Sequence, residues 1–299
     1  MVDNKTLSIE ETNRALKGKR IRSKAGKIAA MVFVYFVLIL MYAPLLYITV
    51  YSFTNATTTG SWSGFSLDLY KNLFNYGSNA KSQAIWNAAR NTILIAVVSA
   101  AISVVIGTLG AIGIYYTRRK WWRNTLEFAN QIPIVNAEIV TALSLCILFV
   151  SVLHMETSFF SLIVGHVVLS LPYVVLSVLP KLEQMDPSIY EAAMDLGATQ
   201  TRALFKVVIP DIMPGILSGF MLSVTLSLDD YVITTFTKPG NFETISTYVD
   251  SAMRKGGLPT QLRAFTAILF GVILLAMIGM YVKSALDVRK QNRKLKGVD

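Results

Sequence analysis

Residues 91–117, NTILIAVVSAAISVVIGTLGAIGIYYT, form a stretch of 27 residues without a charged side chain. The hydrocarbon core of a bilayer is about 30 Å thick, and a helix needs roughly 20 apolar residues to cross it. This stretch is longer than that requirement. It therefore predicts a transmembrane helix.

Five other windows repeat this pattern. Four are charge-free, at residues 28–56, 157–180, 212–228 and 264–282, and the fifth, 128–153, contains only Glu138 as a charged residue. The chain is 53% hydrophobic and 15% charged, with a mean hydropathy of +0.50, whereas a soluble domain covers its apolar core with a polar shell. The sequence predicts an all-α, polytopic membrane protein with six transmembrane helices.

Lys and Arg residues are distributed unevenly between the two sides of the membrane. With the N-terminus inside, 21 of the 28 lie in the tails 1–27 and 283–299 and in the second and fourth connections. Positive residues are retained on the cytoplasmic side, so both termini are expected in the cytoplasm, with the spans surrounded by membrane lipid. Because the net charge of +10 follows from this asymmetry, no nucleic-acid partner is expected.

The segment 57–90, between the first two windows, is rich in Ser, Thr, Gly and Asn and is predicted to be an extracytoplasmic loop. It contains a short amphipathic patch formed by Leu67, Leu69, Tyr70, Leu73 and Phe74. This patch predicts one short helix that lies at the interface or faces a partner.

The fourth connection contains residues 185–215, MDPSIYEAAMDLGATQTRALFKVVIPDIMPG. Asp186 is suited to cap a helix, and Gly197 is suited to end it. Thr199 or Thr201 is suited to cap a second short helix. The pattern predicts a helix, a turn and a helix, which either dock on a partner or only tether the loop at the interface.

This connection resembles the EAA motif of binding-protein-dependent ABC importers, in which Glu-Ala-Ala, a glycine and a final apolar-x-apolar-Pro occur at fixed spacing. The second helix also carries Leu204, and the residues that match the motif are Glu191, Ala192, Ala193, Gly197, Val207, Ile209 and Pro210. Val207 stands where the family usually has Ile. The resemblance extends over 91–282, which implies a MetI-like type I transmembrane domain of five helices with a coupling loop at 181–210, preceded by a first transmembrane helix at 28–56.

The resemblance also implies the partners of this chain. The loop would be a coupling helix that inserts into a groove on a separate ATPase, and the assembly would contain a second permease subunit in a heterodimer, two ATP-binding subunits and an extracytoplasmic solute-binding protein. ATP and Mg²⁺ would be used by the ATPase, and no cofactor is expected on this chain. The sequence has no Walker GxxxxGK[ST], no nucleophile elbow and no HExxH, so a transporter subunit is expected rather than an enzyme.

Two polar interruptions, 225–230 (TLSLDD) and 133–140 (PIVNAEIV), resemble the spermidine/putrescine permeases, in particular their PotC-like branch. The EAA motif itself indicates the class of transporter and not its substrate, so the substrate could instead be an anion, a metal ion or another small solute. A secondary transporter is a rival interpretation, although we find no internal repeat of the kind such transporters often carry. A structural or receptor-like membrane protein is a third.

Three acids lie within or at the ends of the apolar windows. Acids at membrane depth are costly and usually face a cavity or a partner, so Glu138, Asp229 and Asp230 are candidate residues of a substrate pathway. Together with the aromatic faces of Tyr173 and Tyr231, they are suited to a cationic polyamine through charge pairing and cation–π contacts. The alternative is that the two aspartates only end the fifth span and that Glu138 is neutral or hydrogen-bonded.

The remaining distinctive residues are expected to be structural. Cys146 lies in an apolar window and is predicted to pack as a small side chain. His154 and His166 lie too far along the chain from Cys146 and from the acids to argue for a metal site, so hydrogen-bonded structural roles are expected. Gly215 and Gly219 have GxxxG spacing, which favours close helix packing.

Overall fold

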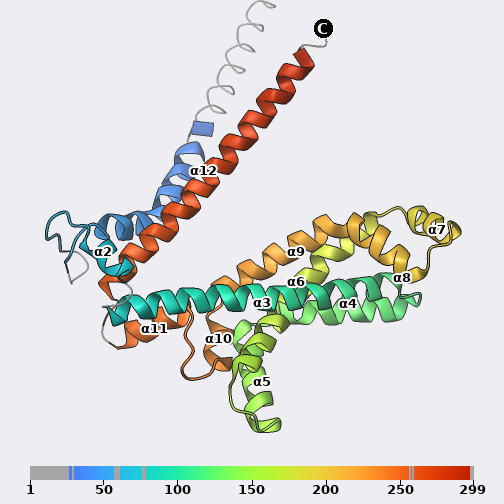
Figure 1. The fold of residues 1–299 in the computed structure, drawn as a ribbon, viewed down its shortest axis with the longest axis horizontal. Coiled ribbons are helices and arrows are strands. Elements are labelled where there is room, and N and C mark those ends of the chain that lie inside the picture. The colour runs from blue at the N-terminus through green and yellow to red at the C-terminus, as the bar shows by residue number, and fades with distance from the viewer. Residues whose placement is uncertain are drawn as a thin grey trace, which may run out of the picture. The chain divides into compact units, whose positions relative to one another are not determined.

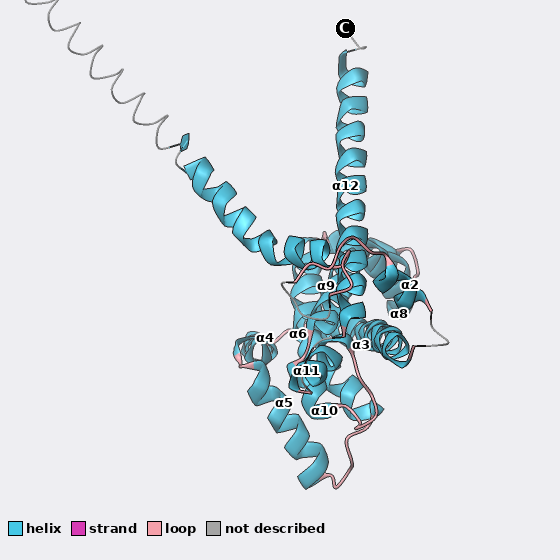
Figure 2. Cartoon of the chain, turned by 90° about the vertical axis from the view of Figure 1, so that its left-hand side faces the viewer, coloured by secondary structure: helices cyan, strands magenta, loops and turns pink. Residues whose placement is uncertain are grey.

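A computed structural model describes residues 27–28, 30–56, 61–75, 79–255, 257 and 259–296. Every regular element among these residues is a helix (Figure 2). The chain divides into two compact units, residues 80–258 and residues 1–79 with 259–299. The all-α class predicted from the sequence is confirmed.

Residues 80–258 are built around three long helices, α3 (Ala80–Tyr116), α6 (Phe159–Gln184) and α9 (Ile209–Asp229), which lie side by side (Figure 1). α3 begins at Ala80, so the predicted loop 57–90 is wrong over its last residues, which are helical. The charged residues of this part made the charge-free window start too late, because a helix can extend beyond the apolar core of a membrane.

Small residues bring the three long helices close together. A Cβ atom added at Gly107 of α3 would lie 2.8 Å from the Cβ of Val174 in α6, and one added at Gly219 of α9 would lie 3.3 Å from the Cα of the same valine. A Cβ at Gly215 would lie 2.9 Å from the carbonyl oxygen of Ser177. The packing role predicted for the GxxxG pair is confirmed, because backbones approach this closely only where side chains are absent.

An apolar core fills one end of this bundle, where α3, α6 and α9 meet the loop that precedes α9. Its fully buried members include Ala111, Val174, Val178, Leu182, Val208 and Ile212. Toward the other end the interior contains hydroxyl groups instead, and Ser103 and Ser170 hydrogen-bond across α3 and α6 at 2.9 Å. The interior therefore changes from apolar to polar along the bundle.

The predicted span 128–153 is wrong as a continuous helix. The chain forms α4 (Lys120–Val135), α5 (Glu138–Ile147) and a wide π-helical turn η1 (Leu148–Val152), and the axis bends by 101° at the break. Pro133 lies in the last turn of α4, and Asn136 and Ala137 have extended backbone conformations. Pro133 has no backbone N–H to donate within α4, and the helix ends two residues after it.

Two polar contacts attach α4 to α6. Arg123 pairs with Glu183 near the end of α6, and the amide nitrogen of Asn130 donates to the carbonyl oxygen of Pro172 at 3.3 Å. The contacts hold the first half of the broken span along the bundle.

The opposite end of the bundle contains two short helices, α10 (Val232–Thr237) and α11 (Ile245–Arg254). α10 packs against both α5 and α6. α11 begins at a capping box formed by Thr244 and Thr247, and the backbone N–H of Ile245 donates to the hydroxyl of Thr92 in α3 at 2.9 Å. These bonds anchor α11 to the start of α3.

The other unit contains the first span, Ala30–Tyr51, the short helix α2 (Asp68–Phe74) and α12 (Thr260–Lys296). Leu69 and Leu73 of α2 are buried, so the helix predicted from the amphipathic patch is confirmed. The Ser52 hydroxyl lies 2.6 Å from the hydroxyl of Tyr70, and the guanidinium of Arg263 donates to the carbonyl oxygen of Ala56 at 3.0 Å. The basic tail predicted at 1–27 lies almost wholly outside the described residues.

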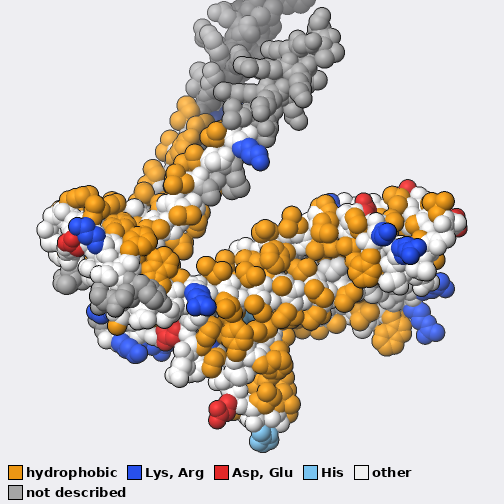
Figure 3. Space-filling model, in the orientation of Figure 1, with side chains coloured by type: hydrophobic (Ala, Val, Ile, Leu, Met, Phe, Trp, Pro, Cys, Tyr) orange, Lys and Arg blue, Asp and Glu red, His pale blue; other side chains and the backbone are white. Residues whose placement is uncertain are grey.

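Among the described residues, five helices are long and apolar enough to cross a membrane, and α4 with the bent α5 and η1 makes a sixth span when the pair is counted as one. Their outer faces are apolar, as the orange surface over α3 and α9 shows (Figure 3). Charged side chains lie instead toward the two ends of the bundle, including the end that bears the loop helices. The count of six spans predicted from the sequence is confirmed with one of the six broken.

Candidate functional site

The loop between α6 and α9 begins with helix α7 (Pro187–Asp195). The carboxylate of Asp186 accepts a hydrogen bond of 2.9 Å from the backbone N–H of Ser188, and Pro187 occupies the first helical position. Hydrogen bonds from Ser188 lower the pKa of the Asp186 carboxyl below its ordinary value. The cap and the first-turn proline therefore form as the sequence predicts.

Helix α7 exposes the residues that match the motif. Glu191 and Ala192 are exposed, Ala193 is half-buried, and no residue of the helix is buried. Leu196, which follows directly, is 90% exposed. An exposed helix whose centre is alanine allows another backbone or side chain to come close, which is the property that a docking surface requires.

Gly197 ends α7 in the left-handed backbone region, with φ of 85°. Its N–H donates to the carbonyl oxygen of Met194 at 2.9 Å, and the N–H of Ala198 donates to the carbonyl oxygen of Ala193 at 3.1 Å. This pair of bonds is a Schellman motif, which favours glycine at that position. The predicted break at Gly197 is confirmed.

The second half of the loop leads directly into a span. Thr199 caps α8 (Gln200–Ala203) by accepting from the backbone N–H of Arg202 at 3.4 Å. A π-helical turn η2 (Leu204–Val208) then joins α8 to α9. Of the predicted motif residues, Leu204, Val207 and Ile209 are half-buried and Pro210 is exposed. The structure thus has one continuous helical element from residue 200 to residue 229.

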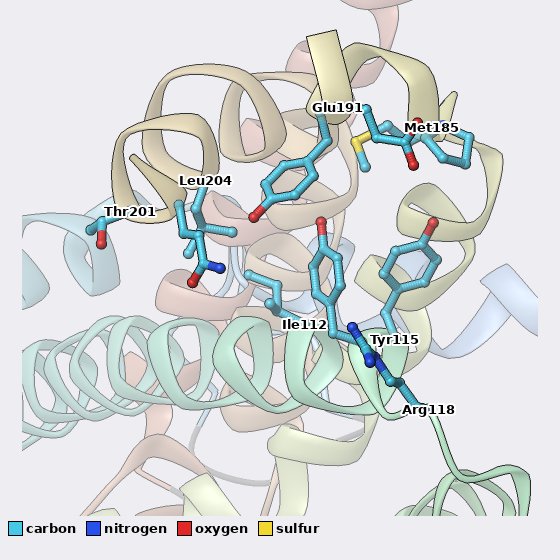
Figure 4. Close-up of a pocket in the computed structure, with 11 residues that line it drawn as sticks. Ile112, Tyr115, Arg118, Met185, Glu191, Thr201 and Leu204 are labelled. Carbon is cyan, nitrogen blue, oxygen red and sulfur yellow. The ribbon is translucent and has the colours of Figure 1, made fainter. Parts of the chain in front are cut away.

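A pocket of about 690 Å³ lies between this loop and the end of α3 (Figure 4). The rings of Tyr116 in α3 and Tyr190 in α7 are 5.8 Å apart. Figure 4 shows side chains from α3 facing those of the loop across the hollow. The pocket is lined by Ile112, Tyr115, Tyr116, Arg118, Met185, Pro187, Tyr190, Glu191, Gln200, Thr201 and Leu204. Contact between α7 and α3 in this region therefore includes an aromatic pair.

The structure separates the candidate pathway residues. Glu138 is exposed as the first residue of α5, directly after the break in the span. Asp229 is exposed at the end of α9, whereas Asp230 is buried. Tyr173 and Tyr231 are half-buried. Among the described residues, no hydrogen bond or ion pair joins Glu138 to either aspartate or to Tyr173, so these side chains do not form one closed site within this chain.

His166 forms a polar cluster that the sequence does not predict as a unit. Its Nδ1 lies 2.8 Å from the Ser227 hydroxyl and its Nε2 lies 3.0 Å from the Thr234 hydroxyl. Asp230 accepts from the Thr234 hydroxyl at 2.7 Å. The hydrogen-bonded role predicted for His166 is confirmed. The only sequence signal for its partners is that Ser227, Asp230 and Thr234 interrupt apolar residues at helical spacing.

His154 and Cys146 have no such surroundings. His154 is exposed with φ of 52°, and its Nδ1 lies 3.2 Å from the carbonyl oxygen of Val152. Cys146 is half-buried. Within the described residues, no group of three His, Cys, Asp or Glu side chains could hold a metal ion.

The apolar spans, the broken helix and the exposed loop together define the membrane component of a transport system. The family model of binding-protein-dependent transport system inner membrane components matches residues 103–292, and the chain belongs to this family. It is therefore a multi-pass inner-membrane permease subunit of an ABC importer and not an enzyme, as the sequence predicted.

Curated relatives and solved structures agree with this family. The chain is 31% identical over 255 residues to the putrescine transport system permease protein PotI of Escherichia coli, covering 84% of this chain and 89% of PotI. It is 32% identical over 260 residues to the spermidine/putrescine permease protein PotC of Haemophilus influenzae, covering 87% and 96%. The predicted resemblance to the spermidine/putrescine permeases is confirmed.

Two solved structures share the fold. One is a bacterial ABC transporter involved in the import of the acidic polysaccharide alginate, with a TM-score of 0.66 at 15% identity, covering 87% of this chain and 96% of that chain. The other is the MetNI methionine ABC transporter, with a TM-score of 0.53 at 19% identity, covering 67% and 94%. At these identities the similarity establishes the fold alone.

Proposed function

We propose that this chain forms half of the translocation pathway of an ATP-driven importer for linear polyamines. The proposed coupling to a separate ATPase is supported by the exposed helix α7, which bears the Glu-Ala-Ala sequence and ends in the Schellman turn at Gly197. Its partners would be a companion permease in a heterodimer, two ATP-binding subunits that use ATP and Mg²⁺, and an extracytoplasmic solute-binding protein. No cofactor on this chain is part of the proposal.

The proposed orientation follows from the positive-inside rule, which places both termini and the loop helices in the cytoplasm. The exposed face of α7, with Ile189, Ala192 and Leu196, then faces the ATPase. Closure of the ATPase would displace α7. The displacement would reach the membrane through the continuous helical element 200–229 and through the contact between the rings of Tyr116 and Tyr190.

The proposed cargo rests on the relatives named for putrescine and spermidine and on the chemistry of the exposed acids. A polyamine carries several ammonium groups on an apolar stem. Glu138 at the break and Asp229 at the end of α9 present carboxylates that can pair with such groups, and Tyr173 and Tyr231 offer ring faces. Because these residues are separated in this chain, the companion permease would complete the pathway.

The experiment uses the complex purified with its companion permease, ATPase and binding protein and reconstituted in vesicles. Uptake of labelled putrescine and spermidine should require ATP and should be inhibited by excess unlabelled polyamine. Gly197→Asp should abolish uptake and reduce copurification of the ATPase while the permease still inserts into the membrane. Gly64→Asp is the matched control, since Gly64 also has a positive φ, of 99°, and open space around it but lies outside the loop. Uptake driven by an ion gradient without ATP would overturn the proposal, as would normal transport by Gly197→Asp.

A further inference from the structure

The buried hydrogen bonds around His166 have one consistent direction. The Thr234 hydroxyl donates to Asp230, so its oxygen is free to accept a bond from Nε2–H of His166. Nδ1 then lacks a proton and accepts from the Ser227 hydroxyl. The Ser99 hydroxyl is shared between the carbonyl oxygen of Ile95 at 2.7 Å and the Ser227 oxygen at 3.3 Å. Every donor in the cluster is satisfied by this assignment.

The cluster joins four helices at the polar end of the bundle. Ser99 belongs to α3, Ser227 to α9, His166 to α6 and Thr234 to α10. The side chains of His166 and Asp230 are each only 1% exposed. Buried polar groups specify one arrangement of the surrounding elements because leaving any of them unpaired is costly.

Asp230 fixes the start of α10. Its carboxylate accepts from the backbone N–H groups of Ile233 at 3.1 Å and Thr234 at 2.8 Å, and its own carbonyl oxygen accepts from the Ser246 hydroxyl at 2.9 Å. α10 in turn sits tightly on α6, since a Cβ at Gly165 would lie 2.6 Å from Cγ2 of Ile233. The corner between α9 and α10 is therefore held on several sides.

This corner determines where the exposed acids lie. Because Asp230 points into the cluster, the preceding Asp229 is exposed and the following Tyr231 is half-buried. α10 also packs against α5, whose first residue is Glu138. We propose that His166 is a positioning residue for cargo passage, which acts through the Thr234 hydroxyl to hold Asp230 inward and so sets the positions of Asp229, Tyr231 and, through α10, Glu138. This role rests on the proposed polyamine function.

Three variants in the reconstituted complex test the role. His166→Leu removes both hydrogen bonds, His166→Gln keeps an amide donor for Thr234, and Ser103→Ala removes a buried hydroxyl at a different level of α3 that does not reach α10. His166→Leu should lower polyamine uptake about tenfold, as expected when buried polar partners are left unpaired. ATP hydrolysis stimulated by the loaded binding protein should persist, so more ATP is used per polyamine imported. His166→Gln should restore part of the uptake, and Ser103→Ala should behave as wild type.

Hydrogen–deuterium exchange gives a readout that does not depend on the cargo. Exchange in residues 229–237 should be faster in His166→Leu and unchanged in Ser103→Ala. Normal uptake by His166→Leu, or a parallel fall of uptake and ATP hydrolysis, would overturn the positioning role, as would unchanged exchange. If instead the wild-type complex hydrolyses ATP but imports no polyamine, the proposed cargo fails, and the exchange experiment still decides whether His166 holds the corner.

Discussion

Gly107 of α3 lies directly against Val174 of α6, so that a Cβ atom on the glycine would be 2.8 Å from the Cβ of the valine. Neither atom can move without moving its helix, because both are attached to the backbone. The same valine contacts Gly219 of α9 from the other side. The three long helices therefore meet at one side chain.

Replacement of Gly107 by valine should push α3 and α6 apart. We expect the free energy of unfolding to fall by about 1–3 kcal/mol, the usual cost of forcing extra carbon atoms into a packed interior. Thermal unfolding of the detergent-solubilised protein measures this loss. Gly113→Val is the matched control, since it places the same side chain in the same helix where nothing lies within 4 Å. Equal losses in the two variants would contradict the packing described for Gly107.

Neutralising the exposed acids should lower polyamine uptake without removing the assembled complex. Glu138→Gln and Asp229→Asn each remove a negative charge from an exposed side chain and leave its size nearly unchanged. Glu156→Gln is the control, because Glu156 is exposed but is not assigned to the pathway. Initial rates of labelled polyamine uptake, normalised to assembled complex, measure the effect. If both variants transport normally, these acids are not pathway residues.

Asp230→Asn should differ from Asp229→Asn although the two residues are adjacent. The Asp230 carboxylate accepts three hydrogen bonds inside the protein, whereas Asp229 is exposed. Asparagine has one acceptor oxygen and an amide that can only donate, so one of those donors loses its partner, at about 1–3 kcal/mol. The midpoint temperature of thermal unfolding should be lowered by Asp230→Asn and not by Asp229→Asn. An equal effect would mean that Asp230 is not held inside.

The start of α7 should depend on pH through Asp186. The pKa of this carboxyl is lowered in the folded protein because Ser188 donates to it. The stabilisation is therefore present above the ordinary pKa of 3.8 and is lost as the pH falls through the lowered value. Amide exchange protection of residues 186–195 should weaken in that acidic range.

Asp186→Asn separates the capping bond from the titration. Asparagine also caps helices but does not titrate in this range, so protection of residues 186–195 should become independent of acidification. Asp195→Asn, at the other end of the same helix, should keep the wild-type pH dependence. A pH dependence that survives Asp186→Asn would assign the effect to another group.

The features that depend on local sequence were predictable. The positions of the unbroken spans follow from charge-free windows, and the Asp186 cap, the break at Gly197 and the Thr199 cap follow from the backbone preferences of those residues. Gly215 and Gly219 indicated close packing because only small residues permit it. These predictions require no knowledge of which element lies opposite.

The features that depend on tertiary contacts were not predictable. The window 128–153 is apolar enough for one helix, and hydropathy alone does not reveal a 101° bend within it. Asp229 and Asp230 look equivalent in sequence, yet only the carboxylate of the second accepts bonds from α10, where the Thr234 hydroxyl links it to His166, 64 positions earlier. The direction of a side chain at a helix end is set by such partners and not by composition.

The break at Asn136 also bears on how the chain enters the membrane. At about 1.5 Å per residue, the 16 residues of α4 and the 10 of α5 reach about 24 Å and 15 Å, and neither covers a hydrocarbon core of about 30 Å. Neither half can therefore be inserted as an independent span. The contacts of Arg123 with Glu183 and of Asn130 with Pro172 attach α4 to α6, so we expect α4, α5 and α6 to enter the bilayer together.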